Sequence, residues 1–243
     1  MKTYDASVII PAFNEQENIV RTLSQLEKIK DFNLEVLVIV DHQEDLTISA
    51  IESDAVLQLD VRVRIQNYGF GPANAVRYGI DNAKSQCVLV MMADGSDDAE
   101  VIPDLINLVN RGVSIACASR YMSGGQQIGG PRFKKFLSKL AGRILYVFAN
   151  VGTHDPTNSF KGYSKNFIDL VGIESRAGFE IGIELVSKAR RHRMPVAEVP
   201  TIWLDRTSGN SNFHITKWIP HYLKWFFHCF GPAKQVLQKE TVK

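Results

Sequence analysis

The sequence predicts an α/β fold, in which a mostly parallel sheet is flanked by helices. The first half repeats one order of elements, a short apolar run, a loop and a helical pattern, which is typical of a doubly wound sheet. Two of the apolar runs end directly before an aspartate, which is Asp41 in one case and Asp94 in the other. Because open α/β sheets bind ligands beyond the carboxyl ends of their strands, we expect a site at this edge.

Four strands are expected in the first half, over residues 6–11, 34–40, 61–65 and 88–93. The first ends at Pro11, which cannot donate to a sheet ladder. The third alternates with a period of two, as a strand with one exposed face does. Helices are indicated after the first strand by apolar residues at helical spacing, and over residues 74–83 behind a glycine-rich turn.

The second half is less regular, with expected strands over residues 114–118 and 196–200 and a helix over 179–191. A basic helix is expected after Pro131. The tail is rich in aromatic residues, and a helix from Pro220 would place its basic side chains on one narrow face and its apolar side chains on the rest. Such a helix suits a membrane interface, and equally the surface of the domain or a dimer interface.

The composition indicates a chain with one large domain. The chain has 243 residues, 45% of them hydrophobic, and its net charge of +2 does not indicate nucleic acid as a partner. Cys87, Cys117 and Cys229 are too few for a disulfide framework, which favours a reducing, cytoplasmic compartment. No signal peptide is visible, and no apolar stretch reaches the roughly 18 residues that a membrane span needs.

An acidic cluster follows the fourth expected strand. Asp94, Asp97 and Asp98 lie close together along the chain around Gly95, where their charges repel one another. A hard cation such as Mg²⁺ relieves that repulsion, because it takes oxygen ligands together with substrate phosphates. The alternative is a solvated turn in which Asp98 caps the next helix.

These segments resemble one family, the family 2 glycosyltransferases with the GT-A fold. The resemblance rests on residues 8–15 (VIIPAFNE), on Asp41 with Asp45 and Thr47, on the glycine-rich residues 69–79, and on Met92-Ala93-Asp94 at the place of the family's metal-binding Asp-X-Asp. Residues 118–121, 155–161, 198–200 and 206–211 resemble the polyprenyl-phosphate branch of this family, which includes dolichyl-phosphate mannose synthase.

The resemblance implies a role for individual residues. It implies that Pro11, Glu15, Asp41, Ala93 and Asp94 bind the donor, and that Asp94 binds the metal together with Asp97 or Asp98. Asp94, Arg120 and Arg206 would act in catalysis. The phosphate-binding residues on the acceptor side would be Arg120, Lys134, Ser138, Arg206 and Ser211. The charge of the basic helix adds Arg132 to them, with a solvated helix face as the alternative.

The sequence also departs from the family. Met92 replaces the first aspartate of Asp-X-Asp and cannot bind a hard cation. His42 and Ser96 stand where the family has an aspartate and a glutamine, and Lys134 replaces a more usual arginine. These departures affect the metal site and the identity of the donor, and not the fold.

The implied reaction is inverting sugar transfer from a GDP- or UDP-sugar to a polyprenyl phosphate at the cytoplasmic face of a membrane, with Mg²⁺ or Mn²⁺ as cofactor. Residues 1–212 would form the GT-A domain, with a nucleotide-sugar half (1–112), an acceptor half (113–212) and an amphipathic tail (213–243). The chain would be a peripheral membrane protein, with a homodimer as an open alternative.

Two other functions stay open from the sequence. The same fold can transfer sugar to a saccharide hydroxyl, which needs a base, and Asp155 or Glu184 is the carboxylate expected for that role. The other is a nucleotide-sugar-binding protein without catalysis, because Met92 removes one metal ligand.

Overall fold

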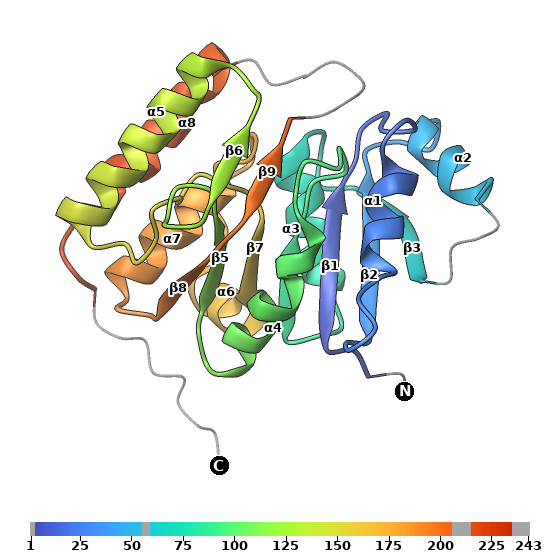
Figure 1. Ribbon diagram of the computed structural model, residues 1–243, viewed down its shortest axis with the longest axis horizontal. Coiled ribbons are helices and arrows are strands. Elements are labelled where there is room, and N and C mark those ends of the chain that lie inside the picture. Colours follow the sequence, from blue (N-terminus) through green and yellow to red (C-terminus); the bar gives the residue numbers. More distant parts are fainter. Residues whose placement is uncertain (1–2, 55–58, 206–214, 235–243) are drawn as a thin grey trace.

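The computed structural model of the chain describes residues 3–54, 59–205 and 215–234. Its centre is a seven-stranded sheet with the order β3-β2-β1-β4-β7-β5-β8 (Figure 1). The strands are β1 (Ala6–Pro11), β2 (Leu34–Val40), β3 (Asp60–Ile65), β4 (Cys87–Val90), β5 (Ile115–Ser119), β7 (Lys161–Ser164) and β8 (Val196–Pro200). A separate two-stranded sheet pairs β6 (Gln126–Ile128) with β9 (Ile202–Leu204).

The helices are α1 (Ile19–Leu26), α2 (Leu46–Glu52), α3 (Pro72–Asn82), α4 (Ile102–Asn110), α5 (Arg132–Ile144), α6 (Lys165–Val171), α7 (Ile181–Arg191) and α8 (Ile215–His228). A 3₁₀ turn, Ala99–Val101, precedes α4, and a π-helical turn, Leu145–Ala149, continues α5. Helices α5 and α8 lie at one end of the molecule and α2 at the other (Figure 1).

The predicted mostly parallel sheet with flanking helices is confirmed, with one antiparallel member. Strand β7 pairs antiparallel with both β4 and β5, while the other neighbours in the large sheet are parallel. Strands β7, β6 and β9 were not predicted. Each is three or four residues long, and of the three only β9 is apolar throughout, so they are too short for a local pattern to reveal them.

Both faces of the sheet are covered, which explains why its strands read as continuous apolar runs. Alternate residues of β1 face opposite ways, since Val8 and Ile10 pack with α1 and α4 while Ile9 packs with α3. Helices α6 and α7 complete the α3 side of the core. Polar side chains lie at the edge of the sheet where the parallel strands have their carboxyl ends.

Helix α8 begins before the residue at which it was expected. The helix starts at Ile215, so Pro220 lies inside it, and the expected start at Pro220 is wrong. Tertiary packing holds the turn before the proline, because Trp218 lies directly over Gly178, where a Cβ would come within 2.4 Å of the indole. Trp225, only 2% exposed, packs with the core. One face of the tail helix therefore docks on the domain.

Candidate functional site

The donor side of the expected site lies where β1, β2 and β4 end. These strands are neighbours in the sheet, so Pro11, Asp41 and Asp94 come to the same edge. Asp41 is half-buried, and its two carboxylate oxygens accept hydrogen bonds from Gln66 Nε2 at 2.7 Å and from the Gly71 backbone N–H at 3.0 Å. The carboxylate thereby holds the glycine-rich turn before α3.

Gln66 is a site residue that the sequence analysis missed. Its buried amide also donates to the Gly69 carbonyl at 2.5 Å and accepts from the Tyr68 N–H at 2.6 Å. The signal was available, because Gln66 is a polar residue directly after β3, as Asp41 is after β2. Gly71 has a φ of 110°, a conformation that favours glycine, so the turn needs this residue.

The loop that carries Glu15 is braced from α2. Asp45 caps α2 and also accepts from the Asn14 N–H at 3.1 Å, and the Thr47 hydroxyl accepts from the Glu15 N–H at 3.0 Å. Glu15 itself accepts from Asn18 Nδ2 at 2.9 Å. Asp45 and Thr47 therefore support the first loop, which places Glu15 beside the edge formed by Pro11.

The three aspartates of the acidic cluster differ in what they do: Asp98 caps a helical turn, while Asp94 and Asp97 are buried within the turn after β4. Asp98 accepts from the Glu100 N–H at 3.0 Å and caps the 3₁₀ turn, as the simpler interpretation of the sequence expected. Asp94 (7% exposed) accepts from the Ser96 N–H at 3.1 Å, and Asp97 (3% exposed) accepts from the Met92 N–H at 2.9 Å. Thr22 Oγ1 donates to the Ala93 carbonyl at 3.0 Å and holds the turn against α1.

The turn carries two buried carboxylates and one buried hydroxyl oxygen. Burial raises the pKa of Asp97 to about 7, and the nearby charge of Asp94 adds to the effect. The Ser96 hydroxyl oxygen is fully buried and has no hydrogen-bond partner among the described residues. Hard oxygen donors are thus present, although no group of three or more His, Cys, Asp or Glu side chains within the described ranges is arranged around a metal position.

The acceptor side is built on a buried ion pair between Arg120 and Asp155. Arg120 Nε and NH2 donate to the two oxygens of Asp155 at 2.7 and 2.9 Å, and the Arg120 backbone N–H donates to Oδ2 at 3.1 Å. Asp155 is completely buried. Burial alone would raise the pKa of Asp155, but the Arg120 guanidinium outweighs it and the pKa is lowered.

Neither carboxylate expected as a base for a hydroxyl acceptor is available. Asp155 is paired with Arg120. Glu184 is completely buried, accepts from the Glu174 and Ser175 N–H groups at 2.6 and 2.8 Å, and pairs with Lys188 Nζ at 2.7 Å. Both carboxylates are held by these contacts, so the structure does not support that role for them.

Ser138, a residue of α5, forms a hydrogen bond with the arginine of this ion pair. Arg120 NH2 makes a long hydrogen bond of 3.5 Å to the Ser138 hydroxyl, which is 2.6 Å from the Thr157 hydroxyl. Lys161, also fully buried, donates to the Pro156 carbonyl at 3.2 Å and to the Asn158 carbonyl. Thr157 and Lys161 were not singled out from the sequence, although both lie in the segment 155–161 that carries the resemblance.

The other cations expected on the acceptor side are Arg132, Lys134 and Arg206. Arg132 and Lys134 are exposed on the first turn of α5. Lys135 Nζ donates to the Gln127 carbonyl at 2.7 Å and so fastens α5 to β6. Arg206 and Ser211 lie outside the described residues.

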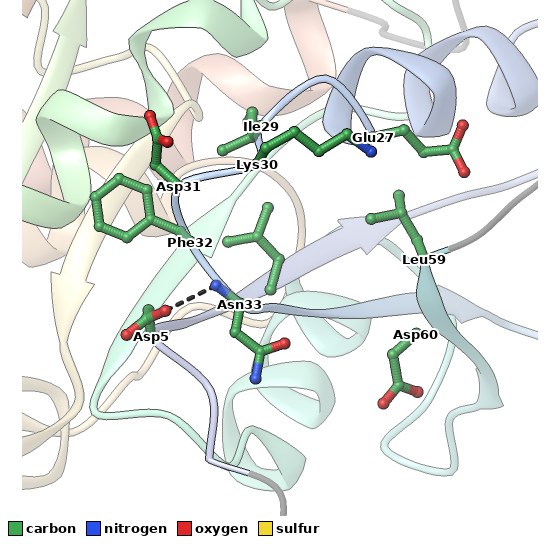
Figure 2. A pocket seen from close by; sticks show the side chains of 10 residues that line it. Asp5, Glu27, Ile29, Lys30, Asp31, Phe32, Asn33, Leu59 and Asp60 are labelled. Carbon is green, nitrogen blue, oxygen red and sulfur yellow. Dashed lines mark hydrogen bonds between the residues drawn. The ribbon is translucent and has the colours of Figure 1, made fainter.

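A hollow of about 530 Å³ lies at the opposite edge of the sheet (Figure 2). Its walls include Asp5 and Asp60, beside the amino ends of β1 and β3, and it faces away from Asp41 and Asp94. Asp5 accepts from the Asn33 N–H at 2.7 Å, and Asp60 pairs with Arg62 at 3.3 Å. These acidic groups serve local contacts and do not extend the candidate site.

Residues 7–171 match the family model described as Glycosyl transferase family 2. The chain belongs to glycosyltransferase family 2. Dolichol-phosphate mannosyltransferase of Pyrococcus furiosus is 30% identical to this family 2 chain over 229 residues, which are 90% of this chain and 64% of that protein. Polyprenol monophosphomannose synthase of Mycolicibacterium smegmatis is 30% identical over 211 residues, which are 84% of this chain and 79% of that protein. The chain thus spans less than two thirds of the Pyrococcus relative.

Solved structures confirm the GT-A fold of this family 2 chain. Glucosyl-3-phosphoglycerate synthase from Mycobacterium tuberculosis, crystallised with Mn²⁺, UDP and glucosyl-3-phosphoglycerate, matches with a TM-score of 0.67 and 16% identity. The match covers 94% of this chain and 81% of that one. In the described part of the family 2 chain, no helix is both long and apolar enough to cross a membrane.

Proposed function

We propose that this family 2 chain is an inverting glycosyltransferase that moves a sugar from a nucleoside diphosphate to a polyprenyl phosphate. The observation that carries the proposal is the acceptor side, where the Arg120 guanidinium and the Ser138 hydroxyl converge and both expected bases are held in other contacts. A phosphate acceptor is already anionic and needs cations for positioning, whereas a hydroxyl acceptor needs a base. The names of the two relatives support this choice.

The donor half would hold the nucleotide sugar along the carboxyl edge of the sheet. Pro11, Glu15 and Asp41 would contact the nucleoside, with Ala93 and Asp94 beside the diphosphate. Asp94 and Asp97 would hold Mg²⁺ or Mn²⁺, with the unpartnered Ser96 hydroxyl next to them, while Asp98 is engaged as a cap. The bound ion would neutralise charge on the leaving diphosphate.

The acceptor half would position the attacking phosphate. Arg120 is held rigidly by Asp155, so its guanidinium can present donors without reorganisation. Arg132 and Lys134 on the exposed turn of α5 would add positive charge, and Arg206 and Ser211 complete the set that we propose. Alignment of phosphate and sugar would supply most of the rate, because the nucleophile needs no activation.

A lipid acceptor lies in a membrane, and the exposed side chains of α5 are suited to contact a membrane surface. Phe133 and Phe136 are 66% and 60% exposed on this helix, and Phe148 in the following turn is 75% exposed. Exposed Lys139 and Arg143 flank these apolar side chains. A helix with apolar and basic faces binds in the plane of an anionic membrane surface, so we propose peripheral attachment at the cytoplasmic face through α5 and the exposed side of α8.

The test is sugar transfer from a panel of UDP- and GDP-sugars to a short polyprenyl phosphate, with and without Mg²⁺ or Mn²⁺. The expected result is a metal-dependent, lipid-linked sugar monophosphate from one donor. Transfer to a saccharide with none to the lipid phosphate would favour the hydroxyl acceptor and refute the proposal. Tight donor binding without turnover on any acceptor would indicate a binding protein.

A further inference from the structure

Four side chains on the acceptor side form a closed ring of hydrogen bonds. Asp155 Oδ1 accepts from Arg120 NH2 at 2.9 Å, and the same NH2 group reaches the Ser138 hydroxyl at 3.5 Å. The Ser138 hydroxyl lies 2.6 Å from that of Thr157, which lies 3.4 Å from Asp155 Oδ1. The ring joins β5, α5 and the segment before β7, and its two hydroxyl-bearing residues are half-buried.

Counting protons gives this ring two arrangements. In one, Thr157 donates to Asp155 and Ser138 donates to Thr157, so both hydroxyl protons are used inside the ring. In the other, Thr157 turns its proton to Ser138, which then accepts from both Thr157 and Arg120. The Ser138 proton can then point to the Tyr121 hydroxyl oxygen or to an incoming phosphate. Asp155 Oδ1 tolerates the change, because it still accepts from Arg120 and from the Asn158 N–H at 3.2 Å.

The neighbouring Tyr121 hydroxyl does not replace Thr157 as the donor to Ser138. Tyr121 donates its hydroxyl proton to Gln127 Oε1 at 2.8 Å, so toward Ser138 its oxygen only accepts. Thr157 is therefore the hydroxyl in the ring that can donate to Ser138. A hydroxyl that accepts two hydrogen bonds is polarised and becomes a better donor through its own proton.

We propose that Thr157 is a positioning residue that turns the Ser138 hydroxyl into a donor to an anionic acceptor phosphate. The inference rests on the proposed function and adds to it a residue that acts through Ser138 and touches no substrate. Rotation of the two hydroxyl protons is the whole change, so the ring can adapt when the phosphate arrives. The 2.6 Å separation of the two oxygens is kept in both arrangements.

The experiment compares Thr157→Val, Thr157→Ser, Ser138→Ala and the double variant Ser138→Ala/Thr157→Val in the full chain. Binding of citronellyl phosphate is measured by calorimetry, and KM for acceptor and donor is measured in the transfer assay. We expect Thr157→Val to weaken phosphate binding and raise the acceptor KM about fivefold, the effect of one hydrogen bond, with an unchanged donor KM. Thr157→Ser should restore the wild-type values.

The double variant separates positioning from an independent contact. If Thr157 acts through Ser138, the double variant binds phosphate as weakly as Ser138→Ala alone, since the two effects are not additive. Additive losses, wild-type affinity in Thr157→Val, or an equal rise of the donor KM would overturn the inference and leave the proposed function standing. If the wild-type chain binds no citronellyl phosphate, the proposed acceptor and the inference both fail.

Discussion

The proposed donor edge and acceptor side of this family 2 chain are held together in different ways. At the donor edge, half-buried Asp41 and the capping residue Asp45 accept hydrogen bonds from backbone N–H groups of the Gly71 turn and the Asn14 loop. On the acceptor side, an ion pair joins Arg120 after β5 to the fully buried carboxylate of Asp155. The donor edge is therefore held by hydrogen bonds to backbone N–H groups, while the acceptor side depends on one buried charge.

The largest effect should come from breaking that pair. Asp155→Asn leaves the Arg120 guanidinium buried without its counter-charge, so the free energy of unfolding should fall by about 3–5 kcal/mol. The matched control at the donor edge is Asp41→Asn, which should lose only about 1 kcal/mol, because Asp41 is half-exposed and makes ordinary hydrogen bonds. Urea unfolding of the two variants and the wild type measures both losses in the free energy of unfolding. Equal losses would contradict the comparison between the two regions.

The second prediction concerns turnover and a residue of the donor edge. Asp94→Ala should lower turnover by roughly 10²–10³-fold, because it removes a group that would stabilise charge on the leaving diphosphate. Its control is Asp98→Ala, which removes only a cap at about 1 kcal/mol of stability. Steady-state kinetics against Mn²⁺ concentration, with calorimetric Mn²⁺ binding, separates the two. Similar metal dependence in both variants would argue against the assignment of Asp94.

The third prediction compares membrane binding by exposed aromatic residues of the acceptor half and of the donor half. Phe133→Ser with Phe136→Ser should weaken binding to anionic liposomes, since each exposed phenylalanine contributes about 2 kcal/mol when it inserts. The control is Phe70→Ser, which alters an even more exposed aromatic residue in the donor half. Trp225 is a poor target for this test because it is buried against the core. Liposome flotation gives the measurement, and unchanged flotation of the α5 variant would reject α5 as the contact.

The smallest effect is a pH dependence where α8 docks on α7. Burial, with the nearby Arg191 charge, lowers the pKa of His228 from 6.5 to about 4. His228 contacts Ser187 and Arg191 at 3.0 and 2.6 Å, and Lys188, Lys234 and Glu174 also act on it. The folded chain therefore resists protonation that the unfolded chain accepts, so stability should fall as the pH drops from 6.5 towards 4.

Thermal unfolding at pH 7 and pH 5 measures this dependence. His228→Gln should reduce the difference between the two pH values, while His221→Gln, at an exposed position of the same helix, should leave it as in the wild type. An identical pH difference in both variants would show that His228 does not carry the effect.

Much of the donor side was predictable from sequence. The runs that became β1, β2 and β4, and the aspartates after two of them, are local signals, and parallel strands bring their carboxyl ends to one edge. Gln66, the partner of Asp41, was missed although it follows β3 directly, because a single polar residue after a strand is an ordinary feature of a loop. Expectations failed where packing overrode local preference, as at Pro220 inside α8.

By itself, the sequence determined the order of strands and helices in the first half, the acidic turn after β4 and the membership of family 2, because each rests on residues close together in the chain. Only the tertiary structure decided that β7 runs antiparallel between β4 and β5, that Asp98 is a cap while Asp94 and Asp97 stay buried, and that Arg120, Ser138, Asp155 and Thr157 meet. The physical reason is that hydrogen bonds and ion pairs between distant segments depend on how the layers pack, and local periodicity carries no record of that packing.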